Sequence, residues 1–387
     1  MRGSTRLVGL AAAVAVLLAV AAMAQAALDT RVYYSFDEVV DADSSGGYTF
    51  NSTDYYADLS GNGHNALLKK DNTVTADNPI GATAKFGNSF RTAGRLNGGN
   101  NHTYTSTPHT ADLNFTGNDD FSFSVWTYAH YENTSWGHRG YYFGKWDSNG
   151  FDLGGTSQGY AFSRRGGSSK KHRWTVNDST AQEAHDLPHD GTDQWDKEEW
   201  ALWTITFDGD AATDNLKAYV NGTLQMTKTL TTTNWANTEP FLIAGRRGEH
   251  QRSFVWPAKT TGDGFIDDFA ALGDTLTGPE VLGLFNLAEH ADLGYAFGDA
   301  EKLLSLHRDG AGSVDVAGLT WSYATGLTGN LGEVTGSGTD FELMLTDNGT
   351  GLTTAGGPVI PEPSTLVIWA LGLLGLALYG WRRKRSA

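Results

Sequence analysis

Acidic side chains that could split a glycosidic bond are scattered along this 387-residue chain. Glycoside hydrolysis needs two carboxyl groups about 5 to 9 Å apart. The nearest candidate is Asp196-Lys197-Glu198-Glu199, just before an expected strand, and adjacent acids in a charged loop are usually solvated. No E-x-D-x-E arrangement occurs, and none of the 11 His belongs to an H-E-x-x-H motif. We therefore expect no catalytic residues and a protein that is not an enzyme.

Composition excludes further classes of chemistry. Cysteine is absent, which excludes disulfides, thiolate catalysis and cysteine-based zinc sites. Residues 27–361 contain 22 basic and 43 acidic residues, a net charge of −21. Such an acidic body makes nucleic acid an improbable partner and is compatible with neutral glycans and divalent cations.

Tryptophans in the expected loops could recognise carbohydrate, because aromatic rings stack on the apolar faces of sugars. A basic cluster lies near them (Arg164, Arg165, Lys170, Lys171, His172 and Arg173) and could meet uronate or sulfate groups. As an alternative, Trp174 shares a strand face with Val176 and belongs to the core, and the basic run is a solvated loop. The candidate carbohydrate-binding residues are Trp136, Trp146, Trp174, Trp195 and Trp256.

The elements that must position these side chains are short strands separated by Gly, Asn and Asp turns. In 121–128, Phe121, Phe123 and Val125 share one face, and Trp126 and Tyr128 share the other. Asn221-Gly222 predicts a type I′ hairpin, since both residues tolerate positive φ. About nine short strands predict an all-β sandwich or jelly roll. They are expected at 31–36, 121–128, 141–145, 159–163, 200–207, 216–220, 223–228, 241–244 and 265–272.

The composition changes after Phe285. Asp299 is placed to cap a short helix over 300–307, and strands are expected at 318–323 and 341–345. We expect 286–357 to form a small α+β appendage that spaces the sandwich from the C-terminal tail or packs onto it.

Both ends carry targeting signals. Residues 1–26 have a positive start, an apolar stretch and an A-x-A site, which predict a signal peptide. In 358–387, Pro361, Glu362 and Pro363 precede an apolar segment at 364–381, which at about 18 residues would span roughly 27 Å as a transmembrane helix. Four cations then form a basic stop that should stay cytoplasmic: Arg382, Arg383, Lys384 and Arg385.

These three features at the C-terminus resemble the PEP-CTERM sorting signal. The resemblance implies an exosortase-type transpeptidase as partner, cleavage near Pro361 to Pro363, and a transient membrane anchor. The protein would then pass to the cell surface or extracellular matrix of a Gram-negative-type bacterium. The alternative is a permanent C-terminal anchor.

The order of the sequence blocks from Asp29 to Phe285 resembles LamG-like, concanavalin A-like jelly rolls. The blocks include YYSFDE at 33–38, DLSGNGHNA at 58–66, FSFSVWTY at 121–128 and the hairpin YVNGTL at 219–224. The resemblance implies a LamG-like domain over 27–285 with a structural Ca²⁺ held by oxygen ligands. The candidate ligands are Asp37, Asp58, Asn62, Asp267 and Asp268, although Asp58 and Asn62 could merely form Asx turns.

Together these features predict an exported, exosortase-processed surface or matrix protein that binds an extracellular polysaccharide or glycoconjugate, or mediates adhesion. The alternative function is that of a polysaccharide hydrolase or lyase on the same jelly-roll fold.

Overall fold

The computed structural model describes residues 27–40, 54–70, 80–81, 83–92, 103–129, 140–146, 158–164, 171–188, 198–245 and 264–354. These residues divide into two compact units. The larger contains 28–289 and 293–298, and the smaller contains 290–292 and the described residues from 299 onward. The signal peptide 1–26, the sorting residues Pro361, Glu362 and Pro363, the segment 364–381 and the basic stop at 382–385 lie outside the described residues.

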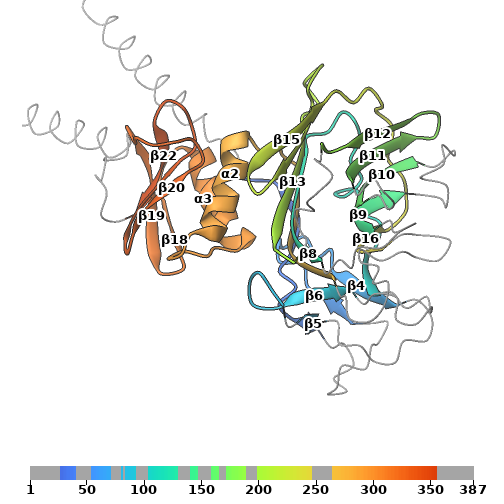
Figure 1. Cartoon of the computed structure of the whole chain (residues 1–387), viewed down its shortest axis with the longest axis horizontal. Helices are drawn as coiled ribbons and strands as arrows, with labels where there is room; N and C mark the ends of the chain where they lie inside the picture. The colour runs from blue at the N-terminus through green and yellow to red at the C-terminus, as the bar shows by residue number, and fades with distance from the viewer. Residues whose placement is uncertain are drawn as a thin grey trace, which may run out of the picture. The chain divides into compact units, whose positions relative to one another are not determined.

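Two antiparallel sheets build the larger unit (Figure 1). In spatial order, the first contains β15 (Thr223–Lys228), β14 (Leu216–Val220), β13 (Ala201–Phe207), β8 (Phe121–Ala129), β17 (Gly264–Leu272), β6 (Ser89–Thr92) and β5 (Ile80–Gly81), and β1 (Thr30–Tyr34) also pairs with β17. The second contains β12 (Gln182–Asp186), β11 (His172–Asp178), β10 (Gln158–Arg164), β9 (Gly140–Trp146), β16 (Phe241–Ile243), β7 (Thr103–Thr107), β4 (Ala66–Lys70), β3 (Tyr55–Tyr56) and β2 (Val39–Val40). The all-β jelly-roll sandwich predicted from the sequence is confirmed.

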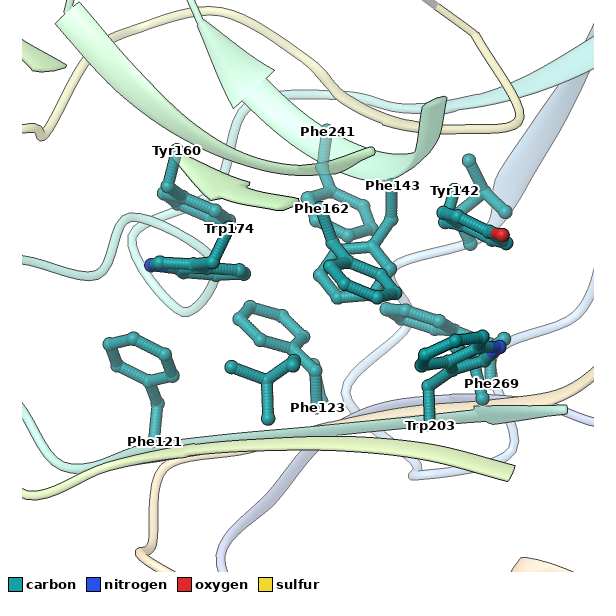
Figure 2. Close-up of a cluster of buried hydrophobic side chains, with 14 of the residues drawn as sticks. Phe121, Phe123, Tyr142, Phe143, Tyr160, Phe162, Trp174, Trp203, Phe241 and Phe269 are labelled. Atoms are coloured by element: carbon teal, nitrogen blue, oxygen red, sulfur yellow. The ribbon is translucent and has the colours of Figure 1, made fainter. Parts of the chain in front are cut away.

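Aromatic side chains from both sheets fill the space between them (Figure 2). Phe121, Phe123 and Val125 of β8 point into this core, as the period-2 pattern predicts. The Phe123 ring lies 4.7 Å from that of Phe143 on the opposite sheet. Aromatic pairs at such separations add to the free energy of burial, so the core can stabilise a large domain without disulfides.

The outer face of the first sheet is also covered, which explains why all nine residues of β17 are buried. Helix α2 (Gly278–Glu289) stacks Phe285 on Trp126 at 6.0 Å. Gly222, in the β14–β15 turn, has φ +74°, and a Cβ there would lie 2.7 Å from Leu282 of α2. The turn therefore needs glycine both for its backbone and for the close approach of the helix.

The sequence analysis missed α2, although its start carries a recognisable signal. Thr277 N donates to Glu280 Oε2 at 2.7 Å, and Glu280 N donates to Thr277 Oγ1 at 3.4 Å. This reciprocal pair is a capping box, written in the sequence as T-G-P-E.

The smaller unit contains an antiparallel sheet in the order β18 (Ser313–Val316), β19 (Leu319–Thr325), β22 (Thr350–Thr354), β21 (Asp340–Met344) and β20 (Val334–Ser337). The helix before it, α3 (Phe297–Asp309), begins three residues earlier than the expected 300–307. Its first two residues belong to the larger unit. Among the described residues, no helix is long and apolar enough to cross a membrane.

Removing the α2 cap should destabilise the protein. Thr277→Ala leaves the Glu280 N–H without the hydroxyl acceptor, and the expected loss is about 1 kcal/mol in the free energy of unfolding. Urea denaturation of this variant and of Thr213→Ala, which changes an exposed loop residue, measures the difference. Equal midpoints for the two variants would contradict the capping role.

Candidate functional site

The acidic pair Asp267-Asp268 lies where β17 changes partners. β6 pairs with residues 264–266, and β1 pairs with residues 269–272. A bulge interrupts the pairing with β8 between Asp267 and Ala270, and Asp268 adopts φ +53°. The bulge leaves Ile266, Phe269 and Ala271 in the core, while both carboxylates bond to groups outside the strand ladders.

Asp268 is occupied by protein donors. Its Oδ1 accepts the Tyr33 hydroxyl at 2.6 Å, and its Oδ2 accepts the backbone N–H of Phe297, at the start of α3. Burial and the Asp268 charge raise the pKa of Tyr33 far above its usual value, so the tyrosine stays a hydrogen-bond donor. This arrangement is a structural anchor, and it leaves Asp268 poorly placed to hold a cation.

Asp267 and Asp37 converge on the turn at residues 83–88. Asp267 Oδ2 accepts the N–H groups of Lys85 and Phe86, each at 2.9 Å, and Asp37 Oδ1 accepts Asn88 N–H at 3.0 Å. Asp267 Oδ1 is buried and has no hydrogen-bond partner. Burial, with further contributions from the Asp268 and Asp37 charges, raises the pKa of Asp267 to about 9. An unpartnered carboxylate oxygen beside a second carboxylate is the one feature of the predicted calcium ligands that suits a cation.

Asp58 and Asn62 lie in a separate loop, and their contacts fit the Asx-turn alternative. Asp58 Oδ1 accepts the N–H groups of Tyr33 and Ser60, and Oδ2 accepts that of His64, at 2.9 to 3.1 Å. Asn62 Nδ2 donates to the carbonyl oxygens of Thr30 and Arg31. Both side chains therefore hold the loop against β1. Within the described residues, no group of three or more His, Cys, Asp or Glu side chains is arranged to hold a metal ion.

Only two of the candidate tryptophans fall among the described residues, and both are buried. Trp174 is 0% exposed, and its ring lies 6.0 Å from that of Tyr160 in the core (Figure 2). This agrees with the alternative that Trp174 is a core residue. Trp146 is 2% exposed, and its ring lies over Gly144, where a Cβ would come within 2.4 Å of it. Neither ring offers a stacking face to solvent. Trp136, Trp195 and Trp256 lie outside the described residues.

Two members of the basic cluster, His172 and Arg173, contact other groups of the protein. His172 is fully buried, lies 2.7 Å from the Tyr142 hydroxyl and packs on Trp203 at 4.2 Å. Arg173 Nε donates to Asp186 Oδ1 at 2.6 Å across the β11–β12 pair. These two residues support the sheet, and their charges are not arranged for an external ligand.

Two patterns with catalytic residue types lack catalytic geometry. His64 Nε2 lies 2.6 Å from Asp112 Oδ2 and 3.4 Å from Thr110 Oγ1, so both partners meet the same ring nitrogen and no relay through the imidazole is possible. From the sequence we expected no G-x-S-x-G motif, and this expectation is wrong, because Gly155-Thr156-Ser157-Gln158-Gly159 has that spacing. Gln158 and Gly159 begin the antiparallel strand β10, whereas a nucleophile elbow leads into a helix.

Sequence reasoning also missed two polar networks. Glu183 Oε1, on the edge strand β12, accepts the N–H and hydroxyl groups of Thr231 and Thr232. Lys145, on β9, is 1% exposed and reaches three protein acceptors. The only signal for the second network is a lysine at the end of the aromatic strand YYFGK.

Comparison with known families gives two matches. Residues 97–282 match the model of the concanavalin A-like lectin/glucanases superfamily (Laminin_G_3), and residues 359–385 match the PEP-CTERM protein-sorting motif. The chain therefore carries a LamG-like, concanavalin A-like domain at 97–282 and a C-terminal PEP-CTERM sorting motif at 359–385, which confirms both resemblances.

No curated protein matches the chain. Among solved structures, the binding domain of Paraclostridial Mosquitocidal Protein 1 is similar at 15% identity and TM-score 0.46, over 83% of this chain and 71% of that chain. Domain 4 of AbnA, a GH43 extracellular arabinanase from Geobacillus stearothermophilus solved with arabinotriose, is similar at 15% identity and TM-score 0.40, over 66% of this chain and 97% of that chain. With TM-scores below 0.5, these similarities carry no information on the ligand of this chain.

Protonation of Glu183 should weaken the protein in acid. Burial raises its pKa, but the four hydrogen bonds from Thr231 and Thr232 outweigh burial and hold the pKa below its usual value. Because the folded-state pKa is the lower one, the stabilisation is present above the unfolded-state pKa and is lost as pH falls through the folded-state pKa. Glu183→Gln should cost about 1 kcal/mol at pH 7 and progressively less toward pH 3.

Urea denaturation at several pH values measures whether the free energies of unfolding of the wild-type and Glu183→Gln proteins approach each other as the pH falls. The wild-type and Glu183→Gln proteins should both carry His185→Gln, because His185 Nε2 lies 3.7 Å from Glu183 Oε2 and a change in the charge of His185 would also change stability with pH. Glu199→Gln, at an exposed position, serves as the matched control. A stability difference that stays constant with pH would contradict the role of the ionised carboxylate.

Proposed function

We propose that this is an exported surface or extracellular-matrix protein whose LamG-like sandwich binds an extracellular glycan or mediates adhesion. One observation carries the proposal: the matched sandwich at 97–282 and the sorting motif at 359–385 occur in the same chain. The motif supplies delivery through an exosortase-type partner and a transient membrane anchor. The sandwich supplies a stable body that can act outside the cell without disulfides.

The carboxylates of the described strands favour binding over hydrolysis. Glu183 and Asp268 are each occupied by protein donors, and Asp267 binds the 83–88 turn. Glu198 and Glu199 are exposed, whereas a catalytic acid is usually made by burial. Asp196 and Lys197 lie outside the described residues. The second candidate function remains a polysaccharide hydrolase or lyase, because the matched superfamily includes glucanases by name.

Incubation of the purified mature protein with neutral, uronate-containing and sulfated glycans separates these functions. We expect retention on at least one glycan without new reducing ends or unsaturated products. Retention should fall about tenfold or more when a stacking tryptophan is removed, as in Trp136→Ala, Trp195→Ala or Trp256→Ala. Leu59→Ala, at a surface position that is 56% exposed, is the control that should leave retention unchanged.

Turnover that disappears in Glu198→Gln or Glu199→Gln would instead establish the enzymatic alternative. Absence of both binding and turnover across the panel would contradict the glycan-binding proposal.

We further propose that a structural Ca²⁺ binds between Asp37 and Asp267. The contacts of Asp58, Asn62 and Asp268 with protein donors argue for this narrower ligand set. Bound calcium would neutralise the buried Asp267 carboxylate at its unpartnered oxygen, and backbone carbonyl oxygens would complete the coordination.

Thermal melting with calcium and with EDTA tests the site. The wild-type midpoint should fall by several degrees in EDTA, because a ligand that binds only the folded state stabilises it. Asp267→Asn should melt at the same temperature in both solutions, while Asp58→Asn should keep the calcium response. Superimposable wild-type curves would exclude the site.

A further inference from the structure

A lysine is buried at the end of β9, surrounded by three polar groups from two loops. Lys145 Nζ lies 2.9 Å from His109 Nδ1 and 3.0 Å from Asn114 Oδ1, and it also donates to the Asn237 carbonyl oxygen. Asn114 Oδ1 receives a second hydrogen bond, from the backbone N–H of Asn237, at 2.9 Å. An amine, an imidazole and a primary carboxamide are thus held within hydrogen-bonding distance, with the amine buried, the carboxamide half-buried and the imidazole open to solvent.

Each component has a property that favours reaction between the amine and the carboxamide. Burial lowers the pKa of Lys145 to about 8, so about a tenth of the amine is neutral and nucleophilic at pH 7. Burial and the Lys145 charge also lower the pKa of His109, which leaves its imidazole free to accept a proton. The Asn237 N–H polarises the Asn114 carbonyl and points at the oxygen where negative charge would develop.

We propose that Lys145 and Asn114 form an intramolecular isopeptide bond. Lys145 Nζ attacks Asn114 Cγ, and His109 Nδ1 accepts the proton that the amine loses. The C–N bond to the side-chain nitrogen of Asn114 then breaks, this nitrogen takes the proton from His109, and ammonia leaves. The step is a transamidation that needs no oxidant, metal or co-reactant. Because the fold holds the amine and the carboxamide close together, the reaction does not require them to meet by diffusion.

The contacts around the amine also suit the product. The new amide keeps one N–H, for which both Asn237 O and His109 Nδ1 are available acceptors, and its carbonyl oxygen keeps the Asn237 N–H donor. The bond would join β9 to the loop before β8. The bond would be a covalent cross-link between two segments of the sandwich, in a chain that has no cysteine to form a disulfide.

Intact mass spectrometry of the mature protein tests the bond directly. The wild-type protein should be about 17 Da lighter than its sequence, the mass of the ammonia released by transamidation. Trypsin should yield a branched peptide joining residues 96–139 to residues 140–164, because an acylated Lys145 is not cleaved. Fragmentation of this peptide locates the link between Lys145 and Asn114 and excludes loss of ammonia elsewhere in the chain.

Three variants assign the roles. Lys145→Arg keeps the buried cation, and Asn114→Ala removes the electrophile, so both should have the full sequence mass. His109→Gln keeps a polar side chain and should accumulate the bond at least tenfold more slowly. A wild-type protein of full mass that releases the peptide 140–145 would overturn the proposal and leave Lys145 as an ammonium held by its three acceptors.

Discussion

The sandwich depends on β17, because this strand pairs with two different strands along one of its edges. β6 occupies its first half and β1 its second, so the first sheet can close only if the strand tolerates the change of partner. The bulge at Asp267-Asp268 provides this tolerance at the cost of a left-handed residue in a buried strand. The two carboxylates then bond to the segments that meet there: Asp267 binds the turn before β6, and Asp268 binds Tyr33 and the first residue of α3.

This constraint explains why the most prominent acidic pair in the sequence is an anchor. A catalytic carboxylate needs a face turned toward substrate, whereas each of these bonds at least one protein donor and both are almost fully buried. Since a buried donor or acceptor left alone costs about 1 to 3 kcal/mol, such acids are most useful where several backbone N–H groups would otherwise lose their partners. Glu183 has the same role on β12, an edge strand of the second sheet. One of its oxygens accepts four hydrogen bonds from Thr231 and Thr232.

Local pattern predicted nine of the 17 described strands in the two sheets, because alternation in 121–128 and the Asn221-Gly222 turn are decided by residues close together in sequence. It missed the short strands β2 to β7 and the strands β11 and β12. It failed where contacts come from far away. Tyr33 and Asp268 are 235 residues apart, and Lys145 meets Asn237 across 92 residues, so no spacing rule could have paired them. Trp146 shows the same limit, since a tryptophan that follows a predicted strand looks exposed until the neighbouring strands are placed, whereas the face that Trp174 shares with Val176 did indicate its burial. Helix α2 is a different case, because its T-G-P-E capping box was present and was overlooked in a sequence dominated by strands.

The buried aromatic rings of this domain stabilise its fold and are not available to contact a ligand. Rings such as Phe123, Phe143 and Trp174 hold the two sheets together from within, and their burial removes them from any role in recognition (Figure 2). In a fold of this kind the segments that join the strands vary more than the strands themselves. The same sandwich can therefore keep its stability while those segments change.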